Sequence, residues 1–98
     1  MQIYLSRPDI TEKEIEAVCA VLRGPGLSMD SHLAAFERAF SEHIERKRAV
    51  AVANGTRGLF MCLSALGIGP GDEVFTTPFT FISSATSIMM VGAKMGLC

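Results

Sequence analysis

The fold of this chain is decided by residues 49–67, AVAVANGTRGLFMCLSALG. The apolar run at residues 49–53 predicts a strand that is covered on both faces, as in a buried sheet with helices on each side. Apolar residues at helical spacing then predict a helix from about Arg57 to Leu66, ended by Gly67. A strand that passes through a glycine-bearing turn into a helix leaves unpartnered backbone N–H groups at the helix start. These groups and the helix dipole favour an anion, so the turn is a candidate phosphate site.

Within this turn, Gly55 brings the backbone close, Thr56 adds a hydroxyl donor and Arg57 adds a positive charge. The pattern is neither a Walker loop, which needs Gly-Lys-Ser/Thr, nor the GxGxxG fingerprint of dinucleotide sites. Many strand–turn–helix units use the same residue types only to turn the chain and cap the helix. From these residues alone, a phosphate cradle and a plain structural turn both remain open.

The composition indicates part of a larger α/β layer. The 98 residues are 49% hydrophobic and only 19% charged, which is little polar surface for so short a chain. We therefore expect residues 1–98 to form a single partial domain, with helices around the first strands of a mixed sheet. The net charge of −1 and the absence of a basic cluster give no indication of nucleic acid or an anionic membrane as partner.

The cysteines and histidines do not suggest a metal or a disulfide framework. Cys19, Cys62 and Cys98 are odd in number and widely spaced, which favours free thiols in a reducing compartment. No CxxC pair or Cys–His cluster has metal-ligand spacing, so we expect no metal site. The N-terminus lacks the pattern of a signal peptide, and no apolar run is long enough to span a bilayer. We expect a cytoplasmic protein.

Two helices are predicted before the central stretch. Thr11 and Glu14 form a capping-box pattern for a helix that runs to about Arg23 and is stopped by Gly-Pro-Gly. A second amphipathic helix is predicted over residues 32–45, with apolar residues on one face.

After the central stretch, the sequence predicts a strand at residues 74–77 and a helix at about residues 83–91. Phe79 and Phe81 stand two residues apart, with Thr80 between them, in the segment that joins this strand to this helix. We expect one ring to point into the core and the other toward the strand ends. Ligands of open α/β sheets bind at the carboxyl ends of strands, where Phe81 and residues 54–57 would both lie. Phe81 could stack on an aromatic cofactor, or it could be a core aromatic; the residues alone do not decide between these alternatives.

Several stretches taken together resemble one protein family. They are Leu5–Pro8, Phe36-Glu37, Ala49–Thr56, Leu66–Val74, Thr77–Phe81 and Val91–Ala93. The chain as far as about Lys94 is similar to the amino-terminal quarter of the DegT/DnrJ/EryC1/StrS sugar aminotransferases. The resemblance implies the α/β fold of the PLP-dependent transferases (fold type I), of which this chain would be the N-terminal part of the large domain. It also implies pyridoxal 5′-phosphate (PLP) as cofactor.

The resemblance implies roles for particular residues. Gly55, Thr56 and Arg57 match the turn that holds the cofactor phosphate, and Phe81 matches the aromatic residue that stacks on the pyridine ring. The segment with Gly26, Leu27 and Ser28 corresponds to the active-site mouth, where substrate and a second subunit meet. Such enzymes are homodimers that transfer an amino group from an amino acid, typically glutamate, to a nucleotide-linked keto sugar.

The chain departs from the family pattern in two places. Arg57 stands where the family usually has a small residue, and residues 95–98 do not continue with the usual proline and strand. None of the lysines matches the position of the Schiff-base lysine; they are Lys13, Lys47 and Lys94. We therefore assign no catalytic residue and expect this fragment not to transaminate alone. Two alternatives are a non-catalytic remnant or interaction partner of a full-length relative, and a PLP-dependent sugar dehydratase of the same family.

Overall fold

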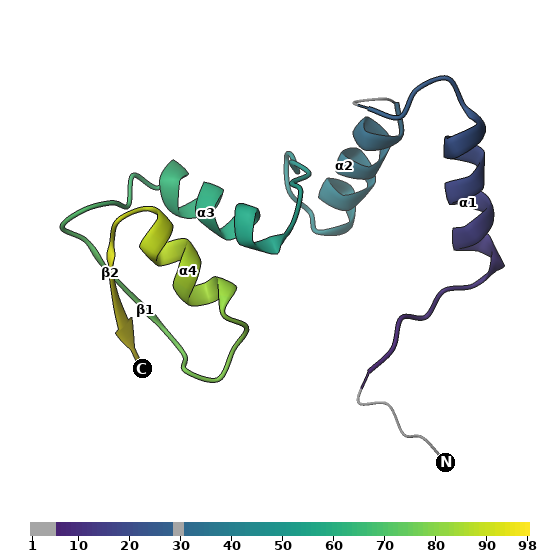
Figure 1. The fold of residues 1–98 in the computed structure, drawn as a ribbon. Helices are drawn as coiled ribbons and strands as arrows, with labels where there is room; N and C mark the ends of the chain where they lie inside the picture. The colour runs from purple at the N-terminus through teal and green to yellow at the C-terminus, as the bar shows by residue number, and fades with distance from the viewer. Residues whose placement is uncertain (1–5, 29–30) are drawn as a thin grey trace, which may run out of the picture. The chain divides into compact units, whose positions relative to one another are not determined.

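The computed structural model describes residues 6–28 and 31–98 (Figure 1). In chain order its elements are α1 (Glu12–Arg23), α2 (Ser31–His43), α3 (Gly55–Ala65), β1 (Glu73–Thr76), α4 (Ser83–Met90) and β2 (Lys94–Leu97). The chain divides into two compact units, one that runs up to Ala49 and one that begins at Val50.

Helix α1 begins with the predicted capping box. The Thr11 side chain accepts a hydrogen bond from the backbone N–H of Lys13, with 3.3 Å between the two atoms. In return, the Glu14 carboxylate accepts one from the backbone N–H of Thr11 at 2.6 Å. The helix ends at Arg23, as predicted, and the N–H of Gly24 donates to the Val21 carbonyl at 3.0 Å. Two of the unpartnered N–H groups of the helix start are thereby satisfied, so the first unit begins with a well-defined helix.

Helix α2 is shorter than predicted at its C-terminal end. It stops at His43, whereas the sequence pattern predicts helix to residue 45. Glu45 adopts a left-handed backbone conformation with φ of 52°, and the N–H of Arg46 donates to the Ser41 carbonyl at 2.8 Å. This reversal closes the helix because the left-handed residue cannot continue it. The rings of Phe36 and Phe40, one turn apart, have their centroids 6.0 Å apart on the apolar face.

The second unit is a small parallel β–α–β arrangement. Strands β1 and β2 pair in parallel, from Glu73 opposite Lys94 to Thr76 opposite Leu97. Helix α4 connects them and packs against both, while α3 packs on α4 (Figure 1). Ile88 of α4 is only 2% exposed and Ala93 only 9%, so the buried centre lies between α4 and the strands. The predicted strand at residues 74–77 and helix at residues 83–91 are confirmed within one residue at each end.

The predicted strand at residues 49–53 is wrong. These residues form no strand in the structure, and Val50 is 71% exposed, so they are not covered on both faces either. The sheet of the described residues consists of β1 and β2 and does not include residues 49–53. The expectation that residues 95–98 do not continue with the usual strand is wrong, because β2 covers Lys94–Leu97. A short run that contains lysine and glycine gives no strand signal, and the strand forms by pairing with β1.

Helix α3 ends as the sequence predicts. Gly67 takes φ of 75°, and the N–H of Ile68 donates to the Leu63 carbonyl at 3.1 Å. A glycine tolerates this left-handed conformation without strain, so it stops the helix cleanly. The helix therefore covers Gly55–Ala65, close to the predicted range.

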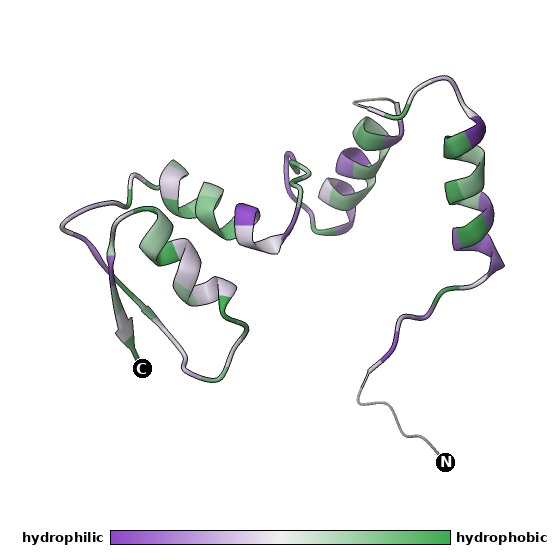
Figure 2. Cartoon of the chain, in the orientation of Figure 1, coloured by the Kyte–Doolittle hydropathy of each residue, from purple (hydrophilic) through white to green (hydrophobic). Residues whose placement is uncertain are grey.

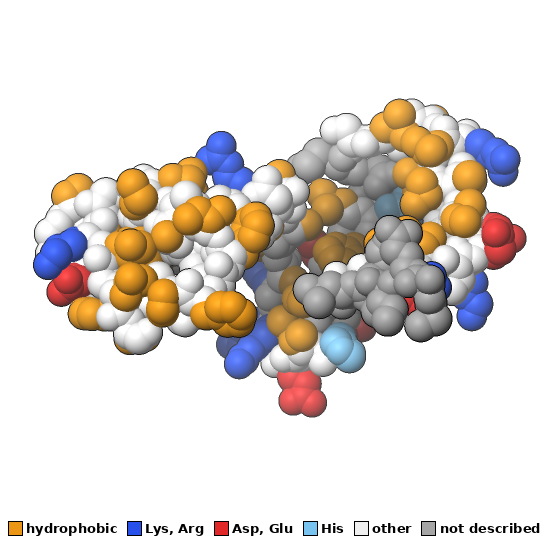
Figure 3. Space-filling model, turned by 60° about the horizontal axis from the view of Figure 1, so that its bottom comes forward, with side chains coloured by type: hydrophobic (Ala, Val, Ile, Leu, Met, Phe, Trp, Pro, Cys, Tyr) orange, Lys and Arg blue, Asp and Glu red, His pale blue; other side chains and the backbone are white. Residues whose placement is uncertain are grey.

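Much of the apolar surface of the described residues is exposed. Figure 2 shows hydrophobic residues along each helix, and Figure 3 shows their side chains spread over the visible face of the second unit. In that unit Leu66 is 75% exposed and Met89 68% exposed. A self-contained domain normally buries such side chains, and the single partial domain expected from the sequence stays a prediction.

Candidate functional site

The candidate phosphate site lies at the start of α3. Asn54 precedes the helix and its side-chain oxygen accepts a hydrogen bond from the backbone N–H of Arg57, at 3.0 Å. The N–H of Gly58 donates to the Asn54 carbonyl at 3.1 Å. In the described part of the chain, the N–H groups of Gly55 and Thr56 have no such partner. These two amides are therefore the ones that remain available to an anion at this helix end.

The side chains around these amides leave room for a ligand. Gly55 is exposed, and a Cβ atom added there would meet nothing within 4 Å. Thr56 is half-buried, which restrains its hydroxyl, whereas Arg57 is exposed and forms no ion pair with any described residue. Amides, a hydroxyl and a guanidinium together suit a phosphate group. The three predicted residues are thus compatible with the role that the resemblance implies.

Asn54 has a role that the sequence analysis did not assign to it. The sequence pattern places Asn54 in the turn, whereas in the structure its side chain caps α3 and accepts a hydrogen bond from the amide of Arg57. Arg57 can therefore contribute its side chain to an anion, but not its backbone N–H. The sequence contains a signal for this cap, because asparagine is among the residues preferred directly before a helix.

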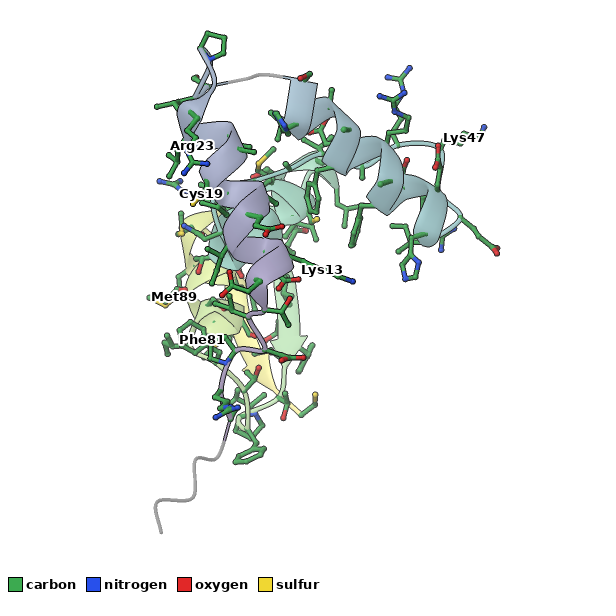
Figure 4. The ribbon with its side chains drawn as sticks, turned by 90° about the vertical axis from the view of Figure 1, so that its right-hand side faces the viewer. Lys13, Cys19, Arg23, Lys47, Phe81 and Met89 are labelled. Carbon is green, nitrogen blue, oxygen red and sulfur yellow. The ribbon has the colours of Figure 1, made fainter. Side chains whose placement is uncertain are left out.

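Phe81 lies in the loop that leads from β1 into α4. Its carbonyl accepts from the N–H of Ser84 at 3.1 Å, which fixes the backbone at the start of the helix. The expectation that either Phe79 or Phe81 points into the core is wrong, because their side chains are 98% and 75% exposed. The loop leaves the sheet at the end of β1. Figure 4 shows the ring of Phe81 projecting away from the ribbon, so it is available to a ligand.

A shallow hollow of about 210 Å³ lies beside Phe81. It is lined by residues of both strands, of the loop that follows β1 and of the start of α4: Thr76, Thr77, Pro78, Thr80, Phe81, Ile82, Ala85, Met95 and Leu97. The start of α3 does not line it. Figure 1 shows, however, that α3 and α4 both begin at the end of this unit toward which the two strands run. The candidate phosphate site and Phe81 are thus placed at one end of the unit, where parallel α/β folds bind ligands.

The predicted substrate residues belong to the other unit. Gly26 is half-buried, Leu27 is 71% exposed and Ser28 is exposed, all in the irregular segment that follows α1. They remain predictions.

Among the described residues, one electrostatic effect is clear, and it concerns Glu14 of α1 in the first unit. Hydrogen bonds from the side chain and backbone of Thr11 hold the pKa of Glu14 below its ordinary value. Across residues 6–28 and 31–98, no group of three or more His, Cys, Asp or Glu side chains is arranged to hold a metal ion. Within the same residues, no helix has the length and apolar character to cross a membrane.

Comparison with known sequences identifies relatives over nearly the whole chain. The family model of the DegT/DnrJ/EryC1/StrS aminotransferase family matches residues 8–98. The spore coat polysaccharide biosynthesis protein SpsC of Bacillus subtilis (strain 168) is 44% identical over 88 residues, 90% of this chain and 23% of the relative. The UDP-4-amino-4-deoxy-L-arabinose–oxoglutarate aminotransferase of Shewanella sediminis (strain HAW-EB3) is 39% identical over 90 residues, which are 92% of this chain and 23% of that protein.

Comparison with solved structures also identifies sugar aminotransferases as relatives. The putative sugar aminotransferase Spr1654 from Streptococcus pneumoniae, solved in a PLP-form and a PMP-form, matches 99% of this chain at 33% identity with a TM-score of 0.91. The match covers 24% and 25% of those two chains. The fold is thus that of the start of a sugar aminotransferase, and the chain spans about a quarter of the length of the relatives it matches.

Proposed function

Because the chain belongs to the DegT/DnrJ/EryC1/StrS aminotransferase family, we propose that it is the N-terminal part of a PLP-dependent sugar aminotransferase. Its task in that enzyme is to hold the cofactor. The observation that carries the proposal is the start of α3, where the amides of Gly55 and Thr56 and the guanidinium of Arg57 are unoccupied by described residues. A relative of the same fold has been solved with PLP, which supports this cofactor.

The residues present fit the phosphate of PLP. Open space beside Gly55 lets an oxygen approach the two amides, and the half-buried Thr56 offers a restrained hydroxyl. The positive end of the α3 dipole and the Arg57 side chain balance the negative charge. The Asn54 cap holds this end of the helix in place, so the amides are oriented before the ligand binds.

Phe81 fits the ring of the cofactor. Its side chain is 75% exposed while its backbone is fixed by the hydrogen bond to Ser84, so the aromatic face is presented without a mobile main chain. We propose that this face packs against the pyridine ring, which is the arrangement that the family resemblance implies. PLP, when bound, supplies the electron sink that amino-group transfer requires.

The remaining proposals rest on the family resemblance and on the names of the relatives. We propose a nucleotide-linked keto sugar as amino acceptor and an amino acid, typically glutamate, as donor. The names of the Shewanella and Streptococcus relatives support a sugar aminotransferase. We also propose a homodimer, with Gly26, Leu27 and Ser28 at the active-site mouth, and a cytoplasmic location.

The 98-residue chain by itself is proposed to be inactive. Lys94 lies on β2 and its Nζ atom is 3.0 Å from the Glu73 carboxylate, in an ion pair on the sheet. None of the three lysines of this chain matches the family's Schiff-base lysine, so we assign none of them to the cofactor. Catalysis therefore requires the lysine supplied by the rest of the fold.

The proposal is tested in a chimera in which residues 8–98 replace the matched region of the Bacillus relative. The dissociation constant for PLP is measured for the chimera and for its Thr56→Ala and Ser64→Ala variants. Ser64 is the matched control because it is a hydroxyl near the other end of the same helix. A hydrogen bond to a charged group contributes about 1.5–3 kcal/mol, so Thr56→Ala is expected to weaken PLP binding at least about tenfold. Equal affinity for both variants would contradict the proposal.

A further inference from the structure

Asn54 and Gly55 form a chemically labile pair at the start of α3. Asn54 is the only asparagine in the sequence of 98 residues, and a glycine follows it directly. Both residues are exposed in the structure. In such a pair the backbone nitrogen of the glycine can attack the side-chain amide of the asparagine, because glycine has no Cβ atom that hinders the approach. The pair is therefore a candidate site of chemical modification.

The backbone nitrogen of Gly55 is open to this reaction. No group of the described residues accepts a hydrogen bond from its N–H, whereas the N–H groups of Arg57 and Gly58 are both bonded to Asn54. A Cβ atom added at Gly55 would meet nothing within 4 Å, so packed side chains do not crowd this residue. The nucleophile is thus neither hydrogen-bonded within the described residues nor shielded by them.

The cap of α3 slows the reaction in the folded chain. Asn54 is extended, with φ of −167° and ψ of 170°. A five-membered ring needs the Gly55 nitrogen nearly eclipsed with the Cβ atom of Asn54, so the Cα–C bond of Asn54 must rotate. The bond from Arg57 to the side-chain oxygen, at 3.0 Å, and the bond from Gly58 to the carbonyl, at 3.1 Å, oppose this rotation. The rate therefore follows the opening of the first turn of α3.

We propose that Asn54 is a site of spontaneous deamidation that closes the phosphate site to PLP. The Gly55 nitrogen forms a bond to Cγ of Asn54, and the proton that it loses passes to the side-chain nitrogen. That nitrogen leaves as ammonia, and a succinimide ring remains. Water then opens the ring at one of its two carbonyl groups and leaves either an aspartate or an isoaspartate. The steps need no oxidant or reductant, and water is the only co-reactant.

Both products change the start of α3. An aspartate places a negative charge beside the amides of Gly55 and Thr56, where it competes with a phosphate for the positive end of the helix. An isoaspartate carries the main chain through its Cβ atom, so the cap on Arg57 loses its geometry. This effect on PLP rests on the proposed function, whereas the deamidation itself does not.

The reaction and the proposed phosphate contact use the same atom. A Gly55 N–H that donates to a phosphate oxygen is held away from Cγ of Asn54. A ligand that binds only the closed helix start also lowers the population of the open form. Saturating PLP is therefore expected to slow the deamidation, whereas pyridoxal, which lacks the phosphate, is expected to leave the rate unchanged.

The modification is measured in the chimera, incubated without ligand in mildly alkaline buffer made with ¹⁸O-labelled water. After transfer to ordinary water, trypsin cuts behind Arg48 and Arg57 and releases residues 49–57 as one peptide. Mass spectrometry is expected to find the heavy oxygen at residue 54, and isoaspartyl methyltransferase to methylate part of the peptide. The matched variant is Gly55→Ala, whose methyl group has room in the fold but hinders the attack, so most of the label is lost.

An unlabelled Asn54 would overturn the proposal if the same incubation fully converts the free peptide of residues 49–57. Labelling of Gly55→Ala at the rate of the parent chimera would also overturn it, because the attack would then not depend on the glycine.

The effect on the site is measured with the dissociation constants for PLP and pyridoxal. They are compared between the fresh chimera, the converted chimera and the Asn54→Asp chimera, which carries one of the two products. The added charge is expected to weaken PLP binding about tenfold or more, without a change for pyridoxal. Equal PLP affinity before and after conversion, in a chimera whose Thr56→Ala variant loses PLP, would overturn this inference and leave the proposed function standing.

Discussion

The ring of Phe75 covers Gly96, its partner in the ladder between β1 and β2. A Cβ atom added at Gly96 would lie 2.5 Å from Cε1 and 2.7 Å from Cδ1 of that ring. Atoms do not approach so closely, so this place in β2 accepts only glycine unless the ring moves. The pair explains why a glycine stands inside a strand, where it otherwise weakens pairing.

Gly96→Ala is expected to destabilise the second unit by about 1 kcal/mol, the low end of the usual cost of added volume, because the Phe75 ring is 61% exposed and can turn aside. Phe75→Ala removes the ring, so in the double variant the added methyl group costs much less. Urea denaturation of the four proteins gives the coupling between the two positions. If Gly96→Ala lowers the free energy of unfolding by the same amount with and without the Phe75 ring, the ring is not what excludes a side chain at this position.

Asn54→Ala is expected to weaken the start of α3. The substitution removes the oxygen that accepts from the N–H of Arg57, and the loss of such a cap costs roughly 0.5–2 kcal/mol. The amide of Arg57 should then exchange faster, while Asn54→Asp, which keeps an acceptor, should preserve its protection. Unchanged exchange at Arg57 in the alanine variant would contradict the assigned cap.

The capping box of α1 makes this helix sensitive to acid. The pKa of Glu14 is lowered by the hydrogen bonds from Thr11, so the unfolded chain binds a proton at this group more readily than the folded one. The stabilisation is therefore complete above the ordinary pKa of the carboxyl group. It is lost as the pH falls through the lowered value of the folded state.

Far-UV circular dichroism between neutral and acidic pH measures this effect. We expect Glu14→Gln to remove part of the acid-induced loss of helix, because glutamine can still accept from Thr11 but does not titrate in this range. Glu16→Gln, which removes a carboxylate from the same helix, is the control. The same acid-induced loss of helix in the Glu14→Gln and Glu16→Gln variants would contradict the prediction.

Lys94→Ala is expected to change little. Its ion pair with Glu73 is well exposed, with 78% of the lysine and 43% of the glutamate side chain accessible, and such pairs contribute about 0–1 kcal/mol. In the chimera, PLP binding should remain the same after this substitution. Loss of the cofactor on Lys94→Ala would instead assign this lysine to the site.

Most helices could be predicted from the sequence because their signals are local. The box formed by Thr11 and Glu14 marks where α1 begins, and Gly67 marks the end of α3. Family and fold class followed from short stretches spread along the chain, and the family match over residues 8–98 confirms them.

The errors have a common physical cause. Whether residues 49–53 form a strand depends on a neighbour that the local sequence does not specify, and the same holds for β2, which forms because it pairs with β1. The exposure of Phe79 and Phe81 likewise depends on what covers the loop. Asn54 gives a local signal for a helix cap. The signal is ambiguous because turns and caps use the same residue types.

The central claim, that the start of α3 holds the phosphate of PLP, is tested most directly by comparing PLP with pyridoxal, which lacks that phosphate. Both dissociation constants are measured for the chimera and for its Thr56→Ala and Arg57→Ala variants. The account predicts that each substitution weakens PLP binding and leaves pyridoxal binding unchanged. Equal losses for both ligands, or no loss for PLP, would show that these residues do not meet the phosphate.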